Sequence, residues 1–212
     1  MTKRIAALLL ALVPALGLAA GKVELLESNA SINNPASLQR GAAMYMSYCS
    51  GCHSLGFQRY SRMAEDLGLP EELVMEKLNF TGAKFGDHIK TSMDPADGQA
   101  WFGKTPPDLS LIARSKPGGP DWLYTFMKSF YADETRPAGW NNTVLAGASM
   151  PHVLWELQGV QRPVYADHEG AGTPVIDRLE LAVPGKLSPE EYDSALRDLV
   201  NFLTYVGEPA AL

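Results

Sequence analysis

The sequence predicts a mostly helical domain with long loop insertions and little strand. Helix start and stop signals stand near both ends of the chain, whereas residues 82–104 are rich in Gly, Asp and Pro, which is typical of a loop. Between residues 159 and 187, only residues 175–183 hint at a strand or two. Because the 212-residue chain has no internal repeat, we expect residues 21–212 to form a single domain.

A secretory leader is predicted over residues 1–20. Two positive residues precede an apolar run over residues 5–18, and small residues follow it, which is the pattern of a cleaved signal peptide. Both Ala19 and Ala20 suit the cleavage position. An uncleaved membrane anchor is the alternative, but Pro14 interrupts the run and the run is short for a span. We therefore expect the mature protein to be exported.

The first helix is expected to begin at Asn34 and Pro35, because Asn caps helix N-termini well and Pro suits the first helical position. Apolar residues then recur at helical spacing as far as Cys49, so we expect the helix to end there. Residues 70–78 predict a second short helix. Residues 107–112 predict a third, closed by the Pro and Gly residues that follow.

Two further helices complete the expected order. One begins at Asp121 and carries a stripe of apolar residues that we interpret as core, namely Trp122, Leu123, Phe126, Met127 and Phe130. The last is the clearest, because Ser188 and Glu191 have the spacing of a capping box, with Pro in the first turn. Its apolar face covers residues 192–206, and residues 207–209 contain the Gly and Pro that stop it.

Both cysteines of the chain lie in one motif, Cys49-Ser50-Gly51-Cys52-His53. C-x-x-C-H is the attachment signature of a c-type haem, in which the thiols add to the haem vinyl groups and the histidine ligates the iron. A redox-active disulfide is one alternative, but no βαβ pattern surrounds the motif and His53 would have no role. Zinc is another, but a closed zinc site needs four ligands and the chain has no second cysteine pair. The motif therefore predicts covalent haem.

The net charge indicates the kind of partner. It is −6 for the whole chain and −8 once Lys3 and Arg4 of the leader are set aside. An acidic exported carrier suits a basic protein partner and argues against nucleic acid or an anionic membrane surface as the ligand. Ordinary solubility is the alternative explanation of this charge.

The sixth ligand of the iron is sought among the methionines and histidines, because a His/Met pair raises the reduction potential. We prefer Met150, which follows a run of small residues and precedes Pro151, so that its loop can approach a flat ring closely and is stiffened. Met93, in a polar loop, stays open as an alternative. The remaining candidates are Met44, Met46, Met63, Met75, Met127, His88, His152 and His168.

Several motifs together make the chain resemble cytochrome c1, the haem subunit of the ubiquinol–cytochrome c oxidoreductase (cytochrome bc1 complex), in its proteobacterial form. The motifs are Arg40-Gly41, the haem motif itself, Arg59-Tyr60-Ser61-Arg62, Pro106-Pro107-Asp108-Leu109-Ser110, Ser149-Met150-Pro151 and Gly207-Glu208-Pro209. The long spacing from His53 to Met150 distinguishes the chain from small soluble cytochromes c. The resemblance covers residues 34–212 and implies a class I cytochrome c-like helical haem domain with one covalently attached haem c.

The resemblance also implies a role for each matching residue. Thioether links are expected at Cys49 and Cys52, and axial ligands at His53 and Met150. The further cofactor-binding residues that it implies are Pro106 and Pro107, which line the haem, Trp122, an aromatic neighbour of the ring, and Arg114 or Lys116, a cation near a haem propionate. Arginine is frequent in the family at the place of Lys116, and lysine lacks its bidentate fork.

The partners that the resemblance implies belong to a respiratory chain. The protein would accept one electron from a Rieske iron–sulfur protein, beside cytochrome b, and pass it to a soluble or membrane-linked cytochrome c. It would work on the periplasmic side of the bacterial inner membrane, as an electron-transfer subunit of quinol–cytochrome c reductase with no bond chemistry of its own. The acidic residues expected to form a docking rim are Asp167, Glu169, Asp177 and Glu180.

The resemblance further implies a C-terminal transmembrane helix. After the leader, the sequence reaches Leu212 with no apolar run of about 18 residues, so we expect it to be cut before its membrane anchor. Two other functions stay open. A free-standing soluble periplasmic electron shuttle would use the same iron ligands, and a haem sensor would need an open sixth position.

Overall fold

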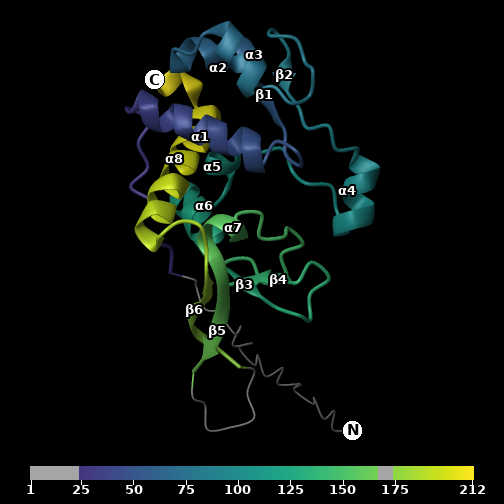
Figure 1. The fold of residues 1–212 in the computed structure, drawn as a ribbon, viewed down its shortest axis with the longest axis vertical. Helices are drawn as coiled ribbons and strands as arrows, with labels where there is room; N and C mark the ends of the chain where they lie inside the picture. The colour runs from purple at the N-terminus through teal and green to yellow at the C-terminus, as the bar shows by residue number, and fades with distance from the viewer. Residues whose placement is uncertain (1–23, 167–173) are drawn as a thin grey trace, which may run out of the picture.

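The structure, a computed structural model, describes residues 24–166 and 174–212 (Figure 1). The leader predicted over residues 1–20 lies outside the described residues. The elements in chain order are α1 (Pro35–Tyr48), β1 (Leu55–Arg59), α2 (Tyr60–Leu67), α3 (Glu71–Lys77), β2 (His88–Ile89), α4 (Pro95–Phe102), α5 (Ile112–Ser115), α6 (Gly119–Lys128), β3 (Phe130–Ala132), β4 (Trp140–Asn142), α7 (Trp155–Gln158), β5 (Gly159–Tyr165), β6 (Ile176–Pro184), α8 (Pro189–Gly207) and a final 3-10 turn, η1 (Pro209–Ala211).

The prediction of a mostly helical domain with little strand is confirmed. The described strands form three separate two-stranded antiparallel sheets, β1–β2, β3–β4 and β5–β6. The hint of strand over residues 175–183 corresponds to β6, which pairs with β5 in a long hairpin that extends away from the helices (Figure 1). Within the described residues, no helix combines the length and the apolar character that a membrane crossing requires.

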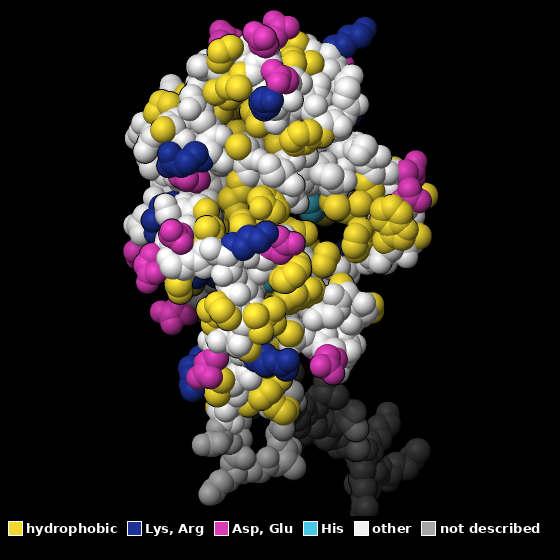
Figure 2. All heavy atoms as spheres, viewed as in Figure 1, with side chains coloured by type: hydrophobic (Ala, Val, Ile, Leu, Met, Phe, Trp, Pro, Cys, Tyr) yellow, Lys and Arg dark blue, Asp and Glu magenta, His cyan; other side chains and the backbone are white. Residues whose placement is uncertain are grey.

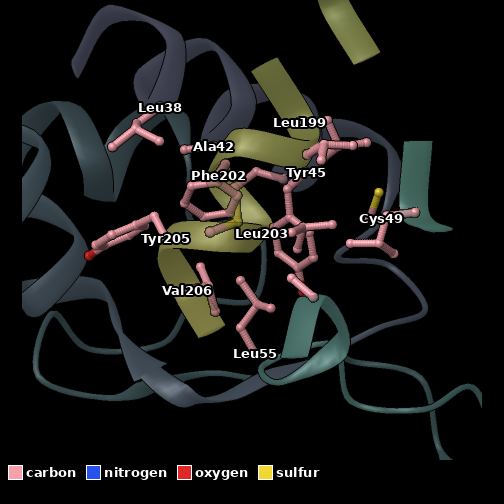
Figure 3. Close-up of a cluster of buried hydrophobic side chains, with 14 of the residues drawn as sticks. Leu38, Ala42, Tyr45, Cys49, Leu55, Leu199, Phe202, Leu203, Tyr205 and Val206 are labelled. Carbon is pink, nitrogen blue, oxygen red and sulfur yellow. The ribbon is translucent and has the colours of Figure 1, made fainter. Parts of the chain in front are cut away.

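The core lies between α1 and α8, which come from opposite ends of the chain. Figure 3 shows that their apolar side chains interlock, with Tyr45 of α1 beside Phe202 of α8, at 5.9 Å between ring centroids. Both rings are fully buried. Gly41 makes this approach possible, since a Cβ there would lie 2.1 Å from the carbonyl oxygen of Asp198 on α8. The glycine therefore sets how close the two helices can pack.

A polar network crosses the same interface around the carboxylate of Asp198. Ser37 donates to its Oδ1 at 2.6 Å, and Arg40 donates to both oxygens, at 2.6 and 2.9 Å. Asn201, one helical turn along α8, donates to Ser37 Oγ at 2.9 Å and accepts the backbone N–H of Ser31 at 2.8 Å. The bonds from Ser37 and Arg40 fix the register of α1 against α8, because they join side chains at defined positions on the two helices.

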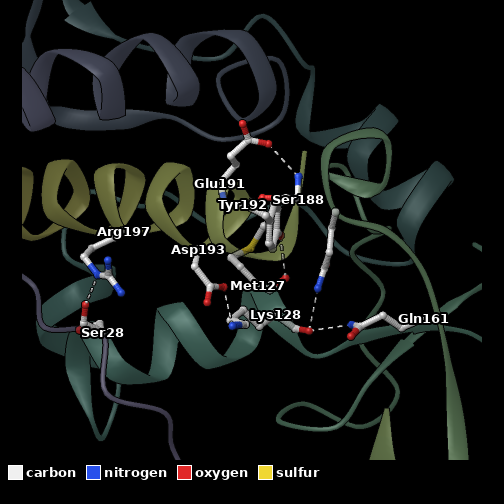
Figure 4. A network of polar contacts seen from close by, with 10 residues as sticks. Ser28, Met127, Lys128, Gln161, Ser188, Glu191, Tyr192, Asp193 and Arg197 are labelled. Carbon is white, nitrogen blue, oxygen red and sulfur yellow. Dashed lines mark hydrogen bonds and ion pairs between the residues drawn. The ribbon is translucent and has the colours of Figure 1, made fainter. Parts of the chain in front are cut away.

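The predicted helix ends at both termini of the chain are confirmed. The side chain of Asn34 accepts the N–H of Ser37 and caps α1, which ends one residue before Cys49. Ser188 and Glu191 form the complete capping box of α8. Figure 4 shows this box beside polar contacts that tie α8 to α6, including the ion pair between Asp193 and Lys128. Local capping chemistry thus determines where these two helices begin.

Three other parts of the predicted order are wrong. The segment 82–104 is not all loop, because it contains β2 and α4, and α4 begins where Asp94 accepts the N–H of Ala96. Residues 107–112 are not a helix, and the helix starts only at Ile112. Asp108 accepts the N–H of Gly56 at 2.7 Å, so this segment is bound to β1 instead.

The third correction concerns the stripe assigned to the helix that follows. Trp122 and Phe126 lie on α6 as predicted, but α6 ends at Lys128 and Phe130 belongs to β3. The prediction also lacked α2, which presents buried Met63 and Leu67 to the core.

Candidate functional site

The motif at Cys49 follows directly on α1. The N–H of Cys49 donates to the carbonyl of Tyr45 at 2.8 Å, and the N–H groups of Cys52 and His53 both donate to the carbonyl of Cys49, at 3.0 and 2.8 Å. These bonds continue the helix as a tight turn, which brings the two cysteines onto the same side. Neither thiol is in a disulfide. Cys49 is buried and Cys52 is half-buried, and burial raises the pKa of the Cys49 thiol to about 12.

A cavity adjoins this turn and brings most of the predicted site together. The space that it encloses is small, about 50 Å³. Its walls are almost entirely apolar. The residues that line it are Tyr48, Cys49, Cys52, His53, Phe102, Pro106, Met150, Pro151 and Val153. Of the predicted site residues, both cysteines, His53, Pro106 and Met150 are therefore neighbours, although they come from three distant parts of the chain.

Figure 2 shows the surface around this region of the molecule. Hydrophobic side chains gather over α4 and across the middle of the face toward the viewer, whereas charged side chains lie mainly around its edges. Among the described residues, several large apolar side chains on this part of the chain are exposed, including Trp101 on α4 and Trp155 on α7. The helices α4 and α7 thus each expose a tryptophan side chain.

The imidazole of His53 is oriented by a backbone carbonyl. Its Nδ1 lies 2.7 Å from the carbonyl oxygen of Pro107 and donates to it, so that Nε2 is the nitrogen left to bind a ligand. Burial lowers the pKa of His53, and the bond to Pro107 offsets part of that effect. Tyr45 donates its hydroxyl to the carbonyl of His53 itself. Pro107 therefore takes part in the site through its backbone, while Pro106 contributes its ring to the wall.

Met150 is the one methionine among the cavity-lining residues of the described chain. Met93, the open alternative, packs near Gly98 of α4 instead. Met63 and Met127 are buried in the core. Among the histidines, His88 borders a different, polar depression, and His168 lies outside the described residues. His152, two residues after Met150, is buried and does not line the cavity.

The remaining predicted residues do not line the cavity. The side chain of Arg114 lies against Gly207 at the end of α8, whose carbonyl oxygen is 3.4 Å from Nη1. The Lys116 ammonium lies 4.6 Å from the centroid of the Trp122 ring, a cation–π contact, and that ring stacks on Phe126 at 4.9 Å. The structure thus pairs Lys116 with Trp122 rather than bringing either to the cavity wall.

The predicted acidic rim is only partly described. Asp167 and Glu169 lie outside the described residues. Asp177 and Glu180 lie on β6, where both bind Arg178, at 2.9 and 2.6 Å. The positive charge of Arg178 offsets part of the negative charge of these two carboxylates. With the other two residues outside the described part of the chain, the acidic rim stays a prediction.

Sequence reasoning missed four of the lining residues. Tyr48 and Phe102 are aromatic, and Pro151 and Val153 flank the Met150 segment. Phe102 is the last residue of α4, the helix that the composition of residues 82–104 concealed. An Asp-Pro pair at residues 94–95 was the available signal for this helix, because it is a good N-cap followed by Pro.

The residues of the cavity fit a covalently attached haem. Two unpaired thiols, one imidazole with a free Nε2 and one thioether meet in an apolar space, which is the donor set that c-type haem requires. A disulfide of thioredoxin type would leave the thioether and the apolar walls without a role.

Comparison with known proteins identifies the family. The model of the Cytochrome C1 family matches residues 29–169. The chain is 50% identical to the cytochrome c1 of Allochromatium vinosum, over the whole of this chain and 87% of that protein. It is 42% identical to the ammonia monooxygenase gamma subunit of Nitrosomonas europaea, over 82% of this chain and 70% of that protein. It is 34% identical to the cytochrome c1 of Rhodospirillum rubrum, over 49% of this chain and 44% of that protein.

The family match includes the haem motif and the whole of α1, and the match to the Allochromatium protein covers every site residue named above. Members of this family carry one covalently bound haem c. The chain therefore belongs to the cytochrome c1 family, carries one covalently attached haem c and transfers electrons within the cytochrome bc1 complex.

Proposed function

We propose that Cys49 and Cys52 attach the haem through thioether bonds and that His53 and Met150 are its two axial ligands. A single observation carries this assignment: all four side chains line one apolar cavity, although Met150 is far from the motif in the sequence. The bond from His53 Nδ1 to the carbonyl of Pro107 supports it, because it leaves Nε2 free and holds the ring in one orientation.

The bound haem supplies a one-electron Fe(III)/Fe(II) couple. The residues around it determine how easily that couple is reduced. The thioether of Met150 is a neutral ligand and favours the ferrous state. Burial lowers the pKa of His53 and so favours the neutral ring, while the bond to Pro107 holds the ring in one orientation. The side chains of Phe102 and Val153 exclude water, which raises the cost of the extra positive charge on the oxidised site.

We propose that the electron arrives from a Rieske iron–sulfur protein, with cytochrome b as a further subunit, and leaves to a soluble or membrane-linked cytochrome c. Membership of the family supports this route. The chain's net charge of −6 supports a basic acceptor, because opposite charge speeds encounter. The leader-like residues at the start of the chain support export to the periplasmic side of the inner membrane.

Replacing Met150 tests the ligand assignment. In the haem-loaded protein, Met150→Ala should lower the midpoint potential by on the order of 100 mV and should let carbon monoxide bind the ferrous form, because the iron loses a ligand that favours Fe(II). Met93→Ala is the matched control and should leave both measurements unchanged. If Met93→Ala lowers the potential and Met150→Ala does not, the ligands have been assigned wrongly.

Purification from native membranes tests the partners. We expect this protein to copurify with a cytochrome b and a Rieske protein, and we expect the reduced complex to lose its electron to cytochrome c more slowly as salt is raised. Recovery of the haem protein alone, as a monomer in the soluble fraction, would instead support the free-standing electron shuttle.

A further inference from the structure

The segment that carries Met150 has few bonds of its own. We define the Met150 loop as residues 143–154, between β4 and α7. Within the described residues, Ser149, Met150 and Pro151 make no hydrogen bond at all to the rest of the protein. The position of the thioether therefore depends on how the loop is held on either side of these three residues.

On the N-terminal side, the peptide groups of Gly147 are held by two side chains from the β3–β4 hairpin. Arg136 Nη2 donates to the carbonyl oxygen of Gly147 at 2.8 Å, and the N–H of Gly147 donates to Asn141 Oδ1 at 2.8 Å. Both of the backbone's polar groups at this residue are thus satisfied by one hairpin. The contact lies three residues before Met150.

The conformation of Gly147 suits this clamp. Its φ is +74°, a value that residues with a Cβ rarely adopt, and the guanidinium of Arg136 lies 3.6 Å from where a Cβ would be. The hairpin is itself braced, because Asp133 accepts Asn141 Nδ2 at 2.8 Å and the N–H of Arg136 donates to the carbonyl of Asp133 at 3.1 Å. The two clamping side chains are therefore held by the same turn.

On the C-terminal side, the loop is held by the ring of His152. This ring stacks on Phe130 at 4.9 Å between centroids and 5° between planes, and meets the edge of Trp140 at 5.2 Å. It is 1% exposed, and neither of its nitrogens has a hydrogen-bond partner among the described residues. The ring therefore anchors the loop by packing between two aromatic rings, two residues after Met150.

We propose that Arg136, Asn141 and His152 are positioning residues that hold the Met150 thioether at the haem iron. None of them lines the cavity, so they act through the loop and not on the cofactor. The inference rests on Met150 being the axial ligand. The new element is the β3–β4 hairpin, which keeps the thioether in place although Ser149, Met150 and Pro151 make no hydrogen bonds within the described residues.

The test compares variants of the haem-loaded protein. Arg136→Gln combined with Asn141→Ala removes both bonds to Gly147, and Arg178→Gln is the matched control, because it removes an arginine with two partners from a different hairpin. Two measurements report on ligation: the weak near-infrared band of thioether-ligated ferric haem, and the binding of carbon monoxide to the ferrous protein.

We expect the double variant to bind carbon monoxide about tenfold more tightly than the wild type and to lose part of the near-infrared band, since losing two bonds favours the detached state of the ligand. Arg178→Gln should match the wild type. His152→Ala should act like the double variant, whereas His152→Phe should restore ligation because it keeps a stacking ring.

Met150→Ala separates the possible failures. If Met150→Ala opens the site and the clamp variants leave both measurements at wild-type values, the clamp is refuted and the ligand assignment stands. If Met150→Ala itself changes neither measurement, the ligand assignment is refuted. Unchanged far-ultraviolet circular dichroism in each variant shows that the fold is intact. If a clamp variant loses both its fold and its ligation, His152→Phe decides the question. The clamp is supported if His152→Phe keeps both the fold and the ligation, and it is refuted if His152→Phe loses them.

Discussion

Replacing Gly41 by alanine should separate α1 from α8. The new Cβ would lie 2.1 Å from the carbonyl oxygen of Asp198 and 2.7 Å from Cβ of Phe202, whereas ordinary contact begins near 3.4 Å. The helices must therefore part by about 1.3 Å, because the nearest obstacle is backbone and cannot change rotamer. Overpacking of this kind costs about 3 kcal/mol, and the better helix propensity of alanine returns about 1 kcal/mol.

We expect Gly41→Ala to lower the free energy of unfolding by about 2 kcal/mol or more. Urea denaturation of the haem-loaded protein, followed by far-ultraviolet circular dichroism, measures this as a lower midpoint at an unchanged slope. Gly86→Ala is the control, because a Cβ there meets nothing within 4 Å and should change the free energy by less than about 0.5 kcal/mol. A Gly41→Ala protein as stable as the wild type would refute the close-packing argument.

Two more predictions concern the polar groups around these helices and the β3–β4 hairpin. Asp198→Ala should cost about 2–3 kcal/mol in the same denaturation assay, because it leaves buried Ser37 and the Arg40 guanidinium without their shared acceptor; a cost no larger than that of Ser37→Ala would contradict this. Asp133→Asn should destabilise the protein at neutral pH but not in acid. Hydrogen bonds from Thr135 and Asn141 hold the Asp133 pKa below its ordinary 3.8, so its contribution is present above 3.8 and disappears as the pH falls through the folded-state pKa. Denaturation at a series of pH values checks this, and an equal loss at every pH would count against it.

The parts of the fold that could be predicted from the sequence are those encoded locally. Asn34 with Pro35 and Ser188 with Glu191 determine the starts of α1 and α8, and the structure confirms both because capping bonds join residues only three apart. The haem motif is equally local. Its five residues alone indicated the cofactor.

The parts that could not be predicted depend on distant partners. Residues 107–112 have helical composition, but Asp108 binds Gly56 across the fold, and this tertiary bond outweighs the local preference. The small residues before Met150 favour it as the ligand, but nothing in the sequence links its loop to Arg136 or Asn141. That link exists only after β3 and β4 pair.

The burial of Cys49 orders two events in biosynthesis. Its side chain is 7% exposed and lies in the cluster that α8 completes (Figure 3). The chain is made from its N-terminus, so the motif emerges first and α8 is the last helix to be finished. Once α8 has docked, this sulfur is exposed only toward the cavity that it lines. We therefore expect haem attachment to be fastest on a chain whose α8 has not yet docked on α1, with the docking of α8 then covering the new bond.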